Sequence, residues 1–201
     1  MILGLTGSVG SGKSTVAKLF EELGGARVID ADAIAHQVQV PGGSAFPEIV
    51  QAFGPAILAE NGSIDRGKLA TLVFGDQSKR KLLNSIVHPK VRTEELRLLD
   101  EWRHEPLVVL MVPLLLENRM QHLVEKIVVV TVDEENRRKR LWERSQMTPG
   151  EIERRLAAQM PDAEKVRQAD FAIDNSGSLQ STRDQVAQII ERISKAPHSG
   201  H

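Results

Sequence analysis

The feature that most constrains this chain is a glycine-rich segment close to its start. Residues 7–14 read Gly-Ser-Val-Gly-Ser-Gly-Lys-Ser, which fits the pattern G-x-x-x-x-G-K-[ST] without a gap. A short apolar run from Ile2 to Thr6 precedes this segment, and apolar residues with helical spacing follow it from Lys13 to Leu23. A strand, a phosphate-binding loop and a helix in this order predict the first unit of a parallel α/β sheet.

The residues of this phosphate loop have separate predicted roles. Glycines allow backbone angles that turn successive N–H groups toward an anion, and the dipole of the following helix adds positive charge. We expect Lys13 to reach the β- and γ-phosphates of ATP and Ser14 to bind Mg²⁺. The predicted nucleotide-binding residues of the loop are Gly10, Ser11, Gly12, Lys13, Ser14 and Thr15. The alternative is a glycine-rich turn that matches by chance. A dinucleotide-binding fold fits less well because no G-x-G-x-x-G register exists.

The rest of the chain predicts a three-layer α/β/α fold with a five-stranded parallel sheet. After the first strand, further strands are predicted at residues 27–29, 107–112, 126–132 and 171–173. Helical patterns dominate residues 33–105, where Pro89 is expected to kink or split a long helix. The predicted parts are a nucleotide-binding core (residues 1–32, 106–136 and 160–195), a helical substrate-binding domain (33–105), a small segment called here the predicted lid (137–159) and a disordered tail (196–201).

The composition of the chain argues against several classes of binding partner. The 201 residues carry a formal net charge of -1, so no overall positive field would hold a nucleic-acid backbone. The absence of cysteine excludes disulfides, thiolate metal sites and cysteine nucleophiles. The longest apolar run, Leu107 to Leu116, is too short to cross a membrane, and the start of the chain lacks the pattern of a signal peptide. We expect a cytoplasmic protein with no nucleic-acid or membrane partner and no obligate protein partner.

Three classes of protein with such a loop compete. A guanine-specific switch would show an N-K-x-D motif, which is absent. A mechanical ATPase would carry an apolar strand that ends in Asp-Glu, whereas the third predicted strand ends in Val112-Pro113. A small-molecule kinase would place carboxylates at the end of the second strand, where Asp30 and Asp32 lie. The sequence therefore favours a kinase that acts on a small, nucleotide-like molecule.

The two carboxylates receive different predicted roles. In such a kinase a carboxylate orients the acceptor hydroxyl and accepts its proton, and we assign this role to Asp32. Asp30 is expected to support the metal ion, through water or by orienting its ligands. The alternative is that one of them caps the helix that starts near Ala33, because Asp is a favoured N-cap residue.

A basic run lies in the predicted lid. Arg137, Arg140 and Arg144 recur at i, i+3 and i+7, so they share one face of a helix. Arginines that close over phosphates neutralise the transferred charge and exclude water. We interpret this face as part of a mobile lid, with a solvated helix face as the alternative.

Several segments, taken in order, resemble the dephospho-coenzyme A kinase family. They are Gly4 to Gly7 leading into Gly10 to Ser14, Val28 to Asp32, Pro41-Gly42, Leu83-Asn84, His88-Pro89, Val112 to Glu117, Arg140 and Arg144, Gln159, Ala169-Asp170, and Ile173 to Gly177. The resemblance covers about the first 180 residues. It implies ATP-dependent phosphorylation of the ribose 3′-hydroxyl of dephospho-CoA, which is the last step of coenzyme A synthesis, and a helical CoA-binding domain.

The resemblance also implies roles for individual residues. Asp32 matches the family's proposed base, and Lys13 and Arg140 match its phosphate-loop lysine and a lid arginine. Adenine of ATP would lie against residues 175–177, which gives nucleotide contacts to Asn175 and Gly177, and Arg144 is predicted to contact the nucleotide from the predicted lid. His88 would contact the substrate, with a packing or capping role as the alternative. The chain departs from the family at Ser8 and Val9, where Gly and Ile are frequent, and at Ser145, where an acidic residue or Gly often stands.

Two other functions remain open at this point. A nucleoside or nucleoside-monophosphate kinase would share the loop and the lid but take a different acceptor. A regulatory protein with a phosphate loop would hydrolyse its nucleotide without any acceptor.

Overall fold

The computed structural model describes residues 1–195, and the predicted tail of residues 196–201 lies outside the described residues. The chain divides into two units. The core unit consists of Met1–Ile29 and the chain from Trp102 onward, and the helical unit consists of Asp30–Glu101. The predicted lid lies within the core unit. The boundaries of the domains inferred from the sequence stay predictions.

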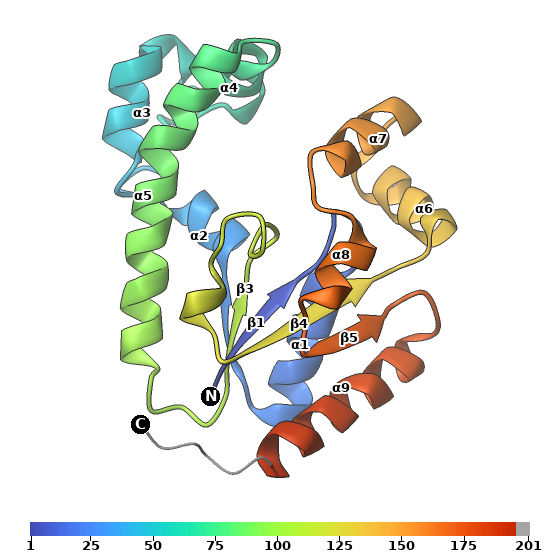
Figure 1. Ribbon diagram of the computed structural model, residues 1–201. Coiled ribbons are helices and arrows are strands. Elements are labelled where there is room, and N and C mark those ends of the chain that lie inside the picture. The colour runs from blue at the N-terminus through green and yellow to red at the C-terminus, as the bar shows by residue number, and fades with distance from the viewer. Residues whose placement is uncertain (196–201) are drawn as a thin grey trace. The chain divides into compact units, whose positions relative to one another are not determined.

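A five-stranded sheet forms the centre of the core unit (Figure 1). Its strands are β1 (Ile2–Thr6), β2 (Arg27–Asp30), β3 (Val108–Met111), β4 (Lys126–Thr131) and β5 (Phe171–Asp174). Their spatial order is β2-β3-β1-β4-β5, and the pairs β1–β3, β1–β4 and β4–β5 are parallel. The predicted five-stranded parallel sheet is confirmed. Because strands that follow β1 lie on both of its sides, the loop after β1 leaves the sheet at a switch point, where ligands of such sheets bind.

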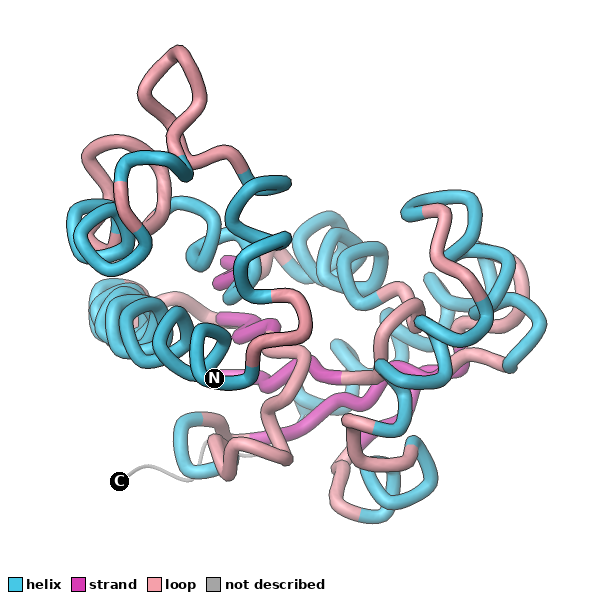
Figure 2. Tube along the Cα trace, turned by 90° about the horizontal axis from the view of Figure 1, so that it is seen from above, coloured by secondary structure: helices cyan, strands magenta, loops and turns pink. Residues whose placement is uncertain are grey.

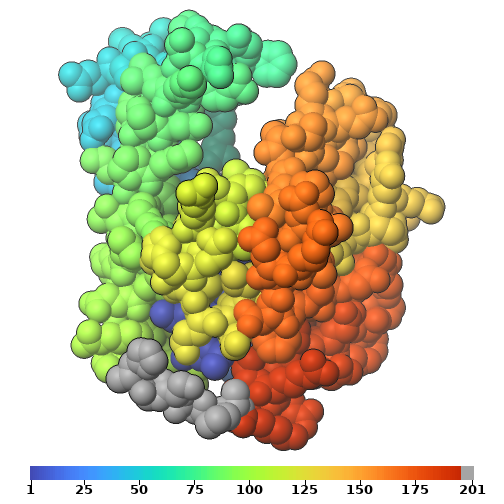
Figure 3. Space-filling model, viewed as in Figure 1, coloured from blue at the N-terminus to red at the C-terminus, as the bar shows by residue number. Residues whose placement is uncertain are grey.

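Helices cover both faces of this sheet (Figures 1 and 2). The helices of the core unit are α1 (Lys13–Gly24), η2 (Gln121–Leu123), α6 (Glu134–Ser145), α7 (Pro149–Ala157), α8 (Asp162–Arg167) and α9 (Leu179–Lys195). α1 and α9 pack together and share one apolar cluster with the strands. α8 packs against β4. The helices α6 and α7, yellow and orange in Figure 3, lie at the surface of the core unit.

The residue pattern explains this burial. All four residues of β3 are buried, and so are the residues from Ile127 to Val130 in β4. Continuous apolar runs are typical of parallel strands that are covered on both faces. In α1 the helical spacing of the apolar residues turns Val16 and Phe20 toward the sheet, where both are fully buried. Gly25 ends this helix in the left-handed conformation, which is common for glycine after the last turn of a helix.

Nearly all described residues of the helical unit lie in helices or turns. The helices of this unit are α2 (Ala31–Gln37), α3 (Phe46–Phe53), η1 (Pro55–Ile57), α4 (Arg66–Val73) and α5 (Gln77–Glu101). We expected Pro89 to kink or split this helix; α5 passes through Pro89 without a break, so the proline does not split it, and the kink stays a prediction. In the described part of the chain, no helix combines the length and the apolar character needed to cross a membrane.

Removal of buried side-chain volume between α1 and the sheet is expected to destabilise the core unit. Leu19 is 3% exposed in α1, whereas Leu179 in α9 is 62% exposed. We expect Leu19→Ala to lower the free energy of unfolding by about 2–5 kcal/mol, because it removes apolar contacts and leaves a cavity. Leu179→Ala is the matched control and should change it by less than about 0.5 kcal/mol. Urea unfolding followed by circular dichroism measures both, and equal losses in the two variants would contradict the packing described here.

Candidate active site

The phosphate loop joins β1 to α1 and requires glycine at specific positions. Gly12 is the N-cap of α1 and has a φ of 88°. A Cβ atom on Gly12 would lie 2.1 Å from Asn175 Nδ2, and one on Gly7 would lie 2.3 Å from the carbonyl oxygen of Val130. Both distances are far below van der Waals contact, and positive φ is a conformation that glycine adopts at low cost. Neighbouring residues of the sheet and of the loop after β5 therefore leave no room for a side chain at these two positions.

The first turn of α1 carries the residues predicted to bind phosphate and metal. Lys13 begins the helix, and its Nζ donates to the carbonyl oxygens of Gly7 (2.8 Å) and Ser8 (3.3 Å). Ser14 and Thr15 follow and are exposed. The first turn of α1 contains no acidic residue, so no carboxylate on that turn opposes the positive end of the helix dipole. This arrangement favours an anion at the loop.

Asn175 holds the second half of the loop from outside. It follows β5, and its side-chain Nδ2 donates to the carbonyl oxygen of Ser11 (2.8 Å). Its Oδ1 accepts from the hydroxyl of Thr182 in α9 (2.9 Å), and both residues are buried. The side chain of Asn175 thus links loop, sheet and helix. Gly177 is exposed two residues further on, and the nucleotide contacts predicted for Asn175 and Gly177 stay predictions.

The three arginines predicted to share one helix face have different surroundings. Arg137 is buried, with its Nη2 2.5 Å from Asp162 Oδ2. Arg140 donates from Nη2 to the carbonyl oxygen of Asn175 (2.8 Å). Its Nη1 is buried, has no hydrogen-bond partner among the described residues and lies 3.4 Å from where a Cβ of Gly12 would be. Arg144 is exposed, and its predicted role stays a prediction. Of these three guanidinium groups, that of Arg140 has a buried N–H donor beside the loop that makes no hydrogen bond to the described residues.

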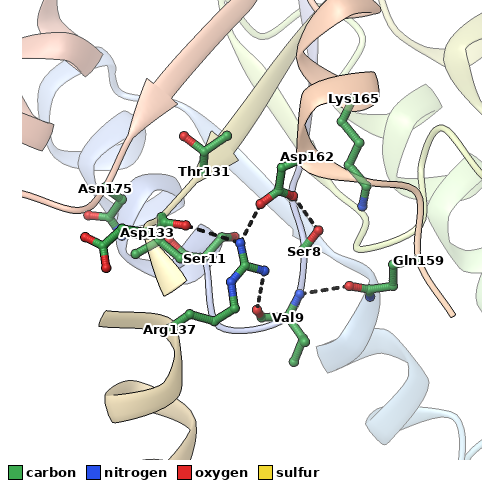
Figure 4. A network of polar contacts seen from close by, with 12 residues as sticks. Ser8, Val9, Ser11, Thr131, Asp133, Arg137, Gln159, Asp162, Lys165 and Asn175 are labelled. Carbon is green, nitrogen blue, oxygen red and sulfur yellow. Dashed lines mark hydrogen bonds and ion pairs between the residues drawn. The ribbon is translucent and has the colours of Figure 1, made fainter. Parts of the chain in front are cut away.

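The first half of the loop is contacted by residues that sequence reasoning did not assign to the site. Ser8 donates from Oγ to Asp162 Oδ1 (2.5 Å), and the N–H of Val9 donates to Gln159 Oε1 (3.0 Å), as Figure 4 shows. Ser8 and Asp162 are 154 positions apart, and no local pattern marks either residue. A cavity of about 440 Å³ lies beside these contacts, and its lining residues are Ser8, Arg137, Leu156, Ala157, Gln159, Met160, Pro161 and Asp162.

A buried ion pair fixes the segment that follows the predicted lid. Lys165 in α8 has no exposed surface, and its Nζ lies 2.9 Å from Glu117 Oε1. The same carboxylate oxygen accepts a hydrogen bond from the N–H of Met160 (3.0 Å). Loss of one partner of such a pair leaves an uncompensated buried charge, which is strongly destabilising. Glu117, part of the Val-Pro-Leu-Leu-Leu-Glu segment, therefore has a structural contact that anchors the chain between α7 and α8.

Capping residues stabilise the first turns of α6 and α7, the helices of the predicted lid. Asp133 caps α6 by accepting from the N–H of Asn136 (2.8 Å), and this hydrogen bond is the largest cause that lowers the pKa of Asp133. Thr148 and Glu151 form a capping box at the start of α7, and the N–H of Thr148 is the largest cause that lowers the pKa of Glu151. Because both pKa values are lowered, these caps stabilise the folded state above the ordinary carboxyl pKa and weaken as the pH falls.

Three predicted site residues belong to the helical unit. Asp30 Oδ1 accepts from the N–H groups of Asp32 (2.9 Å) and Ala33 (3.2 Å), so Asp30 caps α2. This matches the alternative that one of the two carboxylates caps the helix. Asp32 is exposed in the first turn of α2, and His88 is exposed on α5. Their roles toward substrate, and that of Asp30 toward a metal ion, stay predictions.

The chain is similar to one described family along most of its length. Residues 1–181 match the family described as dephospho-CoA kinase. A curated dephospho-CoA kinase of Symbiobacterium thermophilum is 50% identical over 187 residues, which cover 92% of this chain and 78% of the relative. That of Carboxydothermus hydrogenoformans is 46% identical over 95% of this chain and 93% of the relative. The solved dephospho-CoA kinase from Campylobacter jejuni is 28% identical, with a TM-score of 0.70 over 97% of this chain and 98% of that chain.

Two glycines at the ends of α1 allow a matched test of the loop. Gly12 and Gly25 both have positive φ, but the space around Gly25 is open. We expect Gly12→Ala and Gly25→Ala each to lose about 1–2 kcal/mol of stability from backbone strain. Gly12→Ala should in addition weaken ATP binding at least tenfold, because its methyl group displaces Asn175. Calorimetry with ATP measures this difference, and equal ATP affinities of the two variants would show that the loop geometry does not govern nucleotide binding.

Proposed function

Because the chain belongs to the dephospho-CoA kinase family, we propose that it phosphorylates the ribose 3′-hydroxyl of dephospho-CoA with ATP, giving CoA and ADP. The reaction would complete coenzyme A synthesis, and we propose that it takes place in the cytoplasm. The observation that carries the proposal is the phosphate loop between β1 and α1, with Lys13 across it and the guanidinium of Arg140 beside Gly12.

The residues at the loop fit the polyphosphate of ATP. Buried polar groups in proteins are nearly always hydrogen-bonded. Ser11 Oγ and Arg140 Nη1 are buried and have no hydrogen-bond partner among the described residues. An anion held at the loop explains the unused donor of Arg140, because the guanidinium group has donors but no acceptor. The ammonium group of Lys13 donates to two carbonyl oxygens of the loop, and it would turn to the phosphates when ATP binds.

The donor set also fits a magnesium ion that is held largely by the nucleotide. When bound, Mg²⁺ neutralises charge on the β- and γ-phosphates. The described residues contain no group of three or more His, Cys, Asp or Glu side chains that could hold a metal. Magnesium in kinases is commonly bound through one or two protein oxygens and the substrate phosphates. Ser14 would be a direct ligand, and Asp30 would contribute through water.

The acceptor hydroxyl would be oriented by Asp32. This carboxylate lies in the first turn of α2, two residues after β2 ends, and it is exposed. It would hold the 3′-hydroxyl for in-line attack and take its proton late, with His88 as a further contact of the acceptor. Lys13, Arg140 and Arg144 would stabilise charge on the transferred group. Because the transition state of phosphoryl transfer is loose, positioning and electrostatics supply most of the acceleration.

Acceptor dependence distinguishes the proposal from its alternatives. The purified chain is incubated with Mg-ATP and dephospho-CoA, adenosine, AMP, other nucleoside monophosphates or water alone, and ADP release is followed together with the mass of the acceptor. We expect ADP release that requires dephospho-CoA and adds the mass of one phosphoryl group to it, with the 3′ position assigned by NMR. Transfer to another acceptor would overturn the assigned substrate, and ADP release without acceptor would indicate a nucleotide hydrolase.

Substitution of the two aspartates separates catalysis from capping. Asp32→Asn keeps the shape of the side chain but removes the base, so we expect kcat to fall about 10²- to 10⁴-fold with an unchanged circular dichroism spectrum. Asp30→Asn is the matched control, because Asn caps a helix as well as Asp does. Because we propose that Asp30 supports the metal through water, we expect Asp30→Asn to raise the Mg²⁺ concentration needed for half-maximal rate. A kcat of Asp32→Asn within threefold of the wild type would remove Asp32 from its assigned role.

A further inference from the structure

Both ends of the predicted lid meet the phosphate loop. α6 begins shortly after β4 and carries Arg137 in its first turn. After α7 the chain returns through Gln159 and enters α8 at Asp162. Figure 4 shows these three side chains, which come from two separate segments, directed at Ser8 and Val9 of the loop. One short stretch of the loop thus joins the start and the end of the predicted lid.

The carboxylate of Asp162 lies at the centre of these contacts. Its Oδ1 accepts from Ser8 Oγ and its Oδ2 from Arg137 Nη2, both at 2.5 Å. The guanidinium group of Arg137 also donates from Nη1 to the carbonyl oxygen of Val9 (3.3 Å) and from Nη2 to that of Val132 (3.2 Å). Each oxygen of Asp162 therefore has its own partner, one on the loop and one on the predicted lid.

The burial of this cluster distinguishes it from an ordinary surface ion pair. Ser8 is 2% exposed, and the side chains of Arg137 and Asp162 are 7% and 24% exposed. Exposed ion pairs contribute little because water and salt screen them. A buried guanidinium whose partner is removed remains an uncompensated charge, so this cluster constrains the conformation of the residues around it.

The same contacts occupy both backbone groups of Val9. Its N–H donates to Gln159 Oε1 (3.0 Å), and its carbonyl oxygen accepts from Arg137. The peptide groups on either side of Val9 are thereby fixed in orientation by residues of the predicted lid. Because the loop binds phosphate through its backbone N–H groups, fixing its peptide planes pre-organises that binding.

We propose that Ser8, Arg137 and Asp162 form a clamp that holds the phosphate loop in its nucleotide-binding conformation and fastens both ends of the predicted lid to it. Ser8 and Asp162 are positioning residues for phosphoryl transfer: they act on ATP through the loop backbone. This inference rests on the proposed function, since it concerns the same site.

Ser8→Ala tests the clamp with the smallest change. Ser8 does not have positive φ, so alanine fits its backbone conformation, and only the hydroxyl group is lost. We expect the KM for ATP and the calorimetric Kd for ATP to rise about tenfold, because the apparent affinity falls by the fraction of loops that remain competent. The KM for dephospho-CoA and kcat should stay within about twofold. Ser194→Ala, which removes an exposed hydroxyl group on α9, is the matched control.

A second variant and a double-mutant cycle separate this role from a purely structural one. Asp162→Asn keeps an acceptor for Ser8 but removes the negative charge beside Arg137, and we expect it to raise the KM for ATP as well. If the two residues act through one clamp, Ser8→Ala will have little further effect on the KM for ATP in the Asp162→Asn background. Glu22→Gln, which breaks the exposed pair with Arg183, is the control for loss of an ion pair in the same unit.

The outcomes separate the clamp from the proposed function. Folded Ser8→Ala with a Kd for ATP within twofold of the wild type overturns the clamp, even if its free energy of unfolding is lower. Additive effects of the two substitutions on the Kd for ATP overturn it as well. If Asp162→Asn does not fold, Ser8→Ala alone decides. A wild-type chain that binds ATP but does not phosphorylate dephospho-CoA contradicts the proposed function, while the ATP affinities of the variants still test the clamp.

Discussion

The candidate site depends on hydrogen bonds that reach the phosphate loop through its carbonyl groups. A loop that binds an anion needs most of its backbone N–H groups for the ligand, so its conformation is held largely through other atoms, with the N–H of Val9, which donates to Gln159, as an exception. The carbonyl oxygen of Ser11 accepts from Asn175, that of Val9 accepts from Arg137, and that of Gly7 accepts from Lys13. These donors come from the loop after β5, from α6 and from α1, so three parts of the core unit shape one turn of backbone.

The same contacts determine which positive charges are available to a phosphate. Arg137 and Arg140 are one helical turn apart, yet only Arg137 has a carboxylate partner. The pairing with Asp162 compensates the charge of Arg137 at close range, whereas Arg140 bonds to a carbonyl oxygen, and its attraction to the carboxylate of Asp133 is only the last of the causes that lower the pKa of Asp133. In a partly buried site the charge of Arg140 interacts more strongly with an anion than it would in water. The first arginine thus holds the loop, and the second can act on the ligand.

The sequence predicts those parts of the molecule that local patterns encode. Continuous apolar runs predict β3 and β4, and the glycine motif predicts the turn between β1 and α1, because burial on two faces and positive φ each restrict the residue type. The interaction of Ser8 with Asp162 has no such signal, because the two residues are 154 positions apart and no local pattern connects them. Asp30 was ambiguous for another reason: a carboxylate after a strand fits a metal site and a helix cap equally well, and the observed cap leaves its second role open.

The fastening of both ends of α6 and α7 limits how the arginines between them can move. A segment held at Arg137 and at Gln159 can shift in its middle more than at its ends. Arg140 is one turn from the held residue and bonded to Asn175, so it is expected to keep its place when nucleotide binds. Arg144 is a further turn away, about 6 Å along the helix axis, and is exposed. We therefore propose different roles for the two arginines: Arg140 is pre-organised before the phosphates arrive, and Arg144 reaches them through motion of the segment.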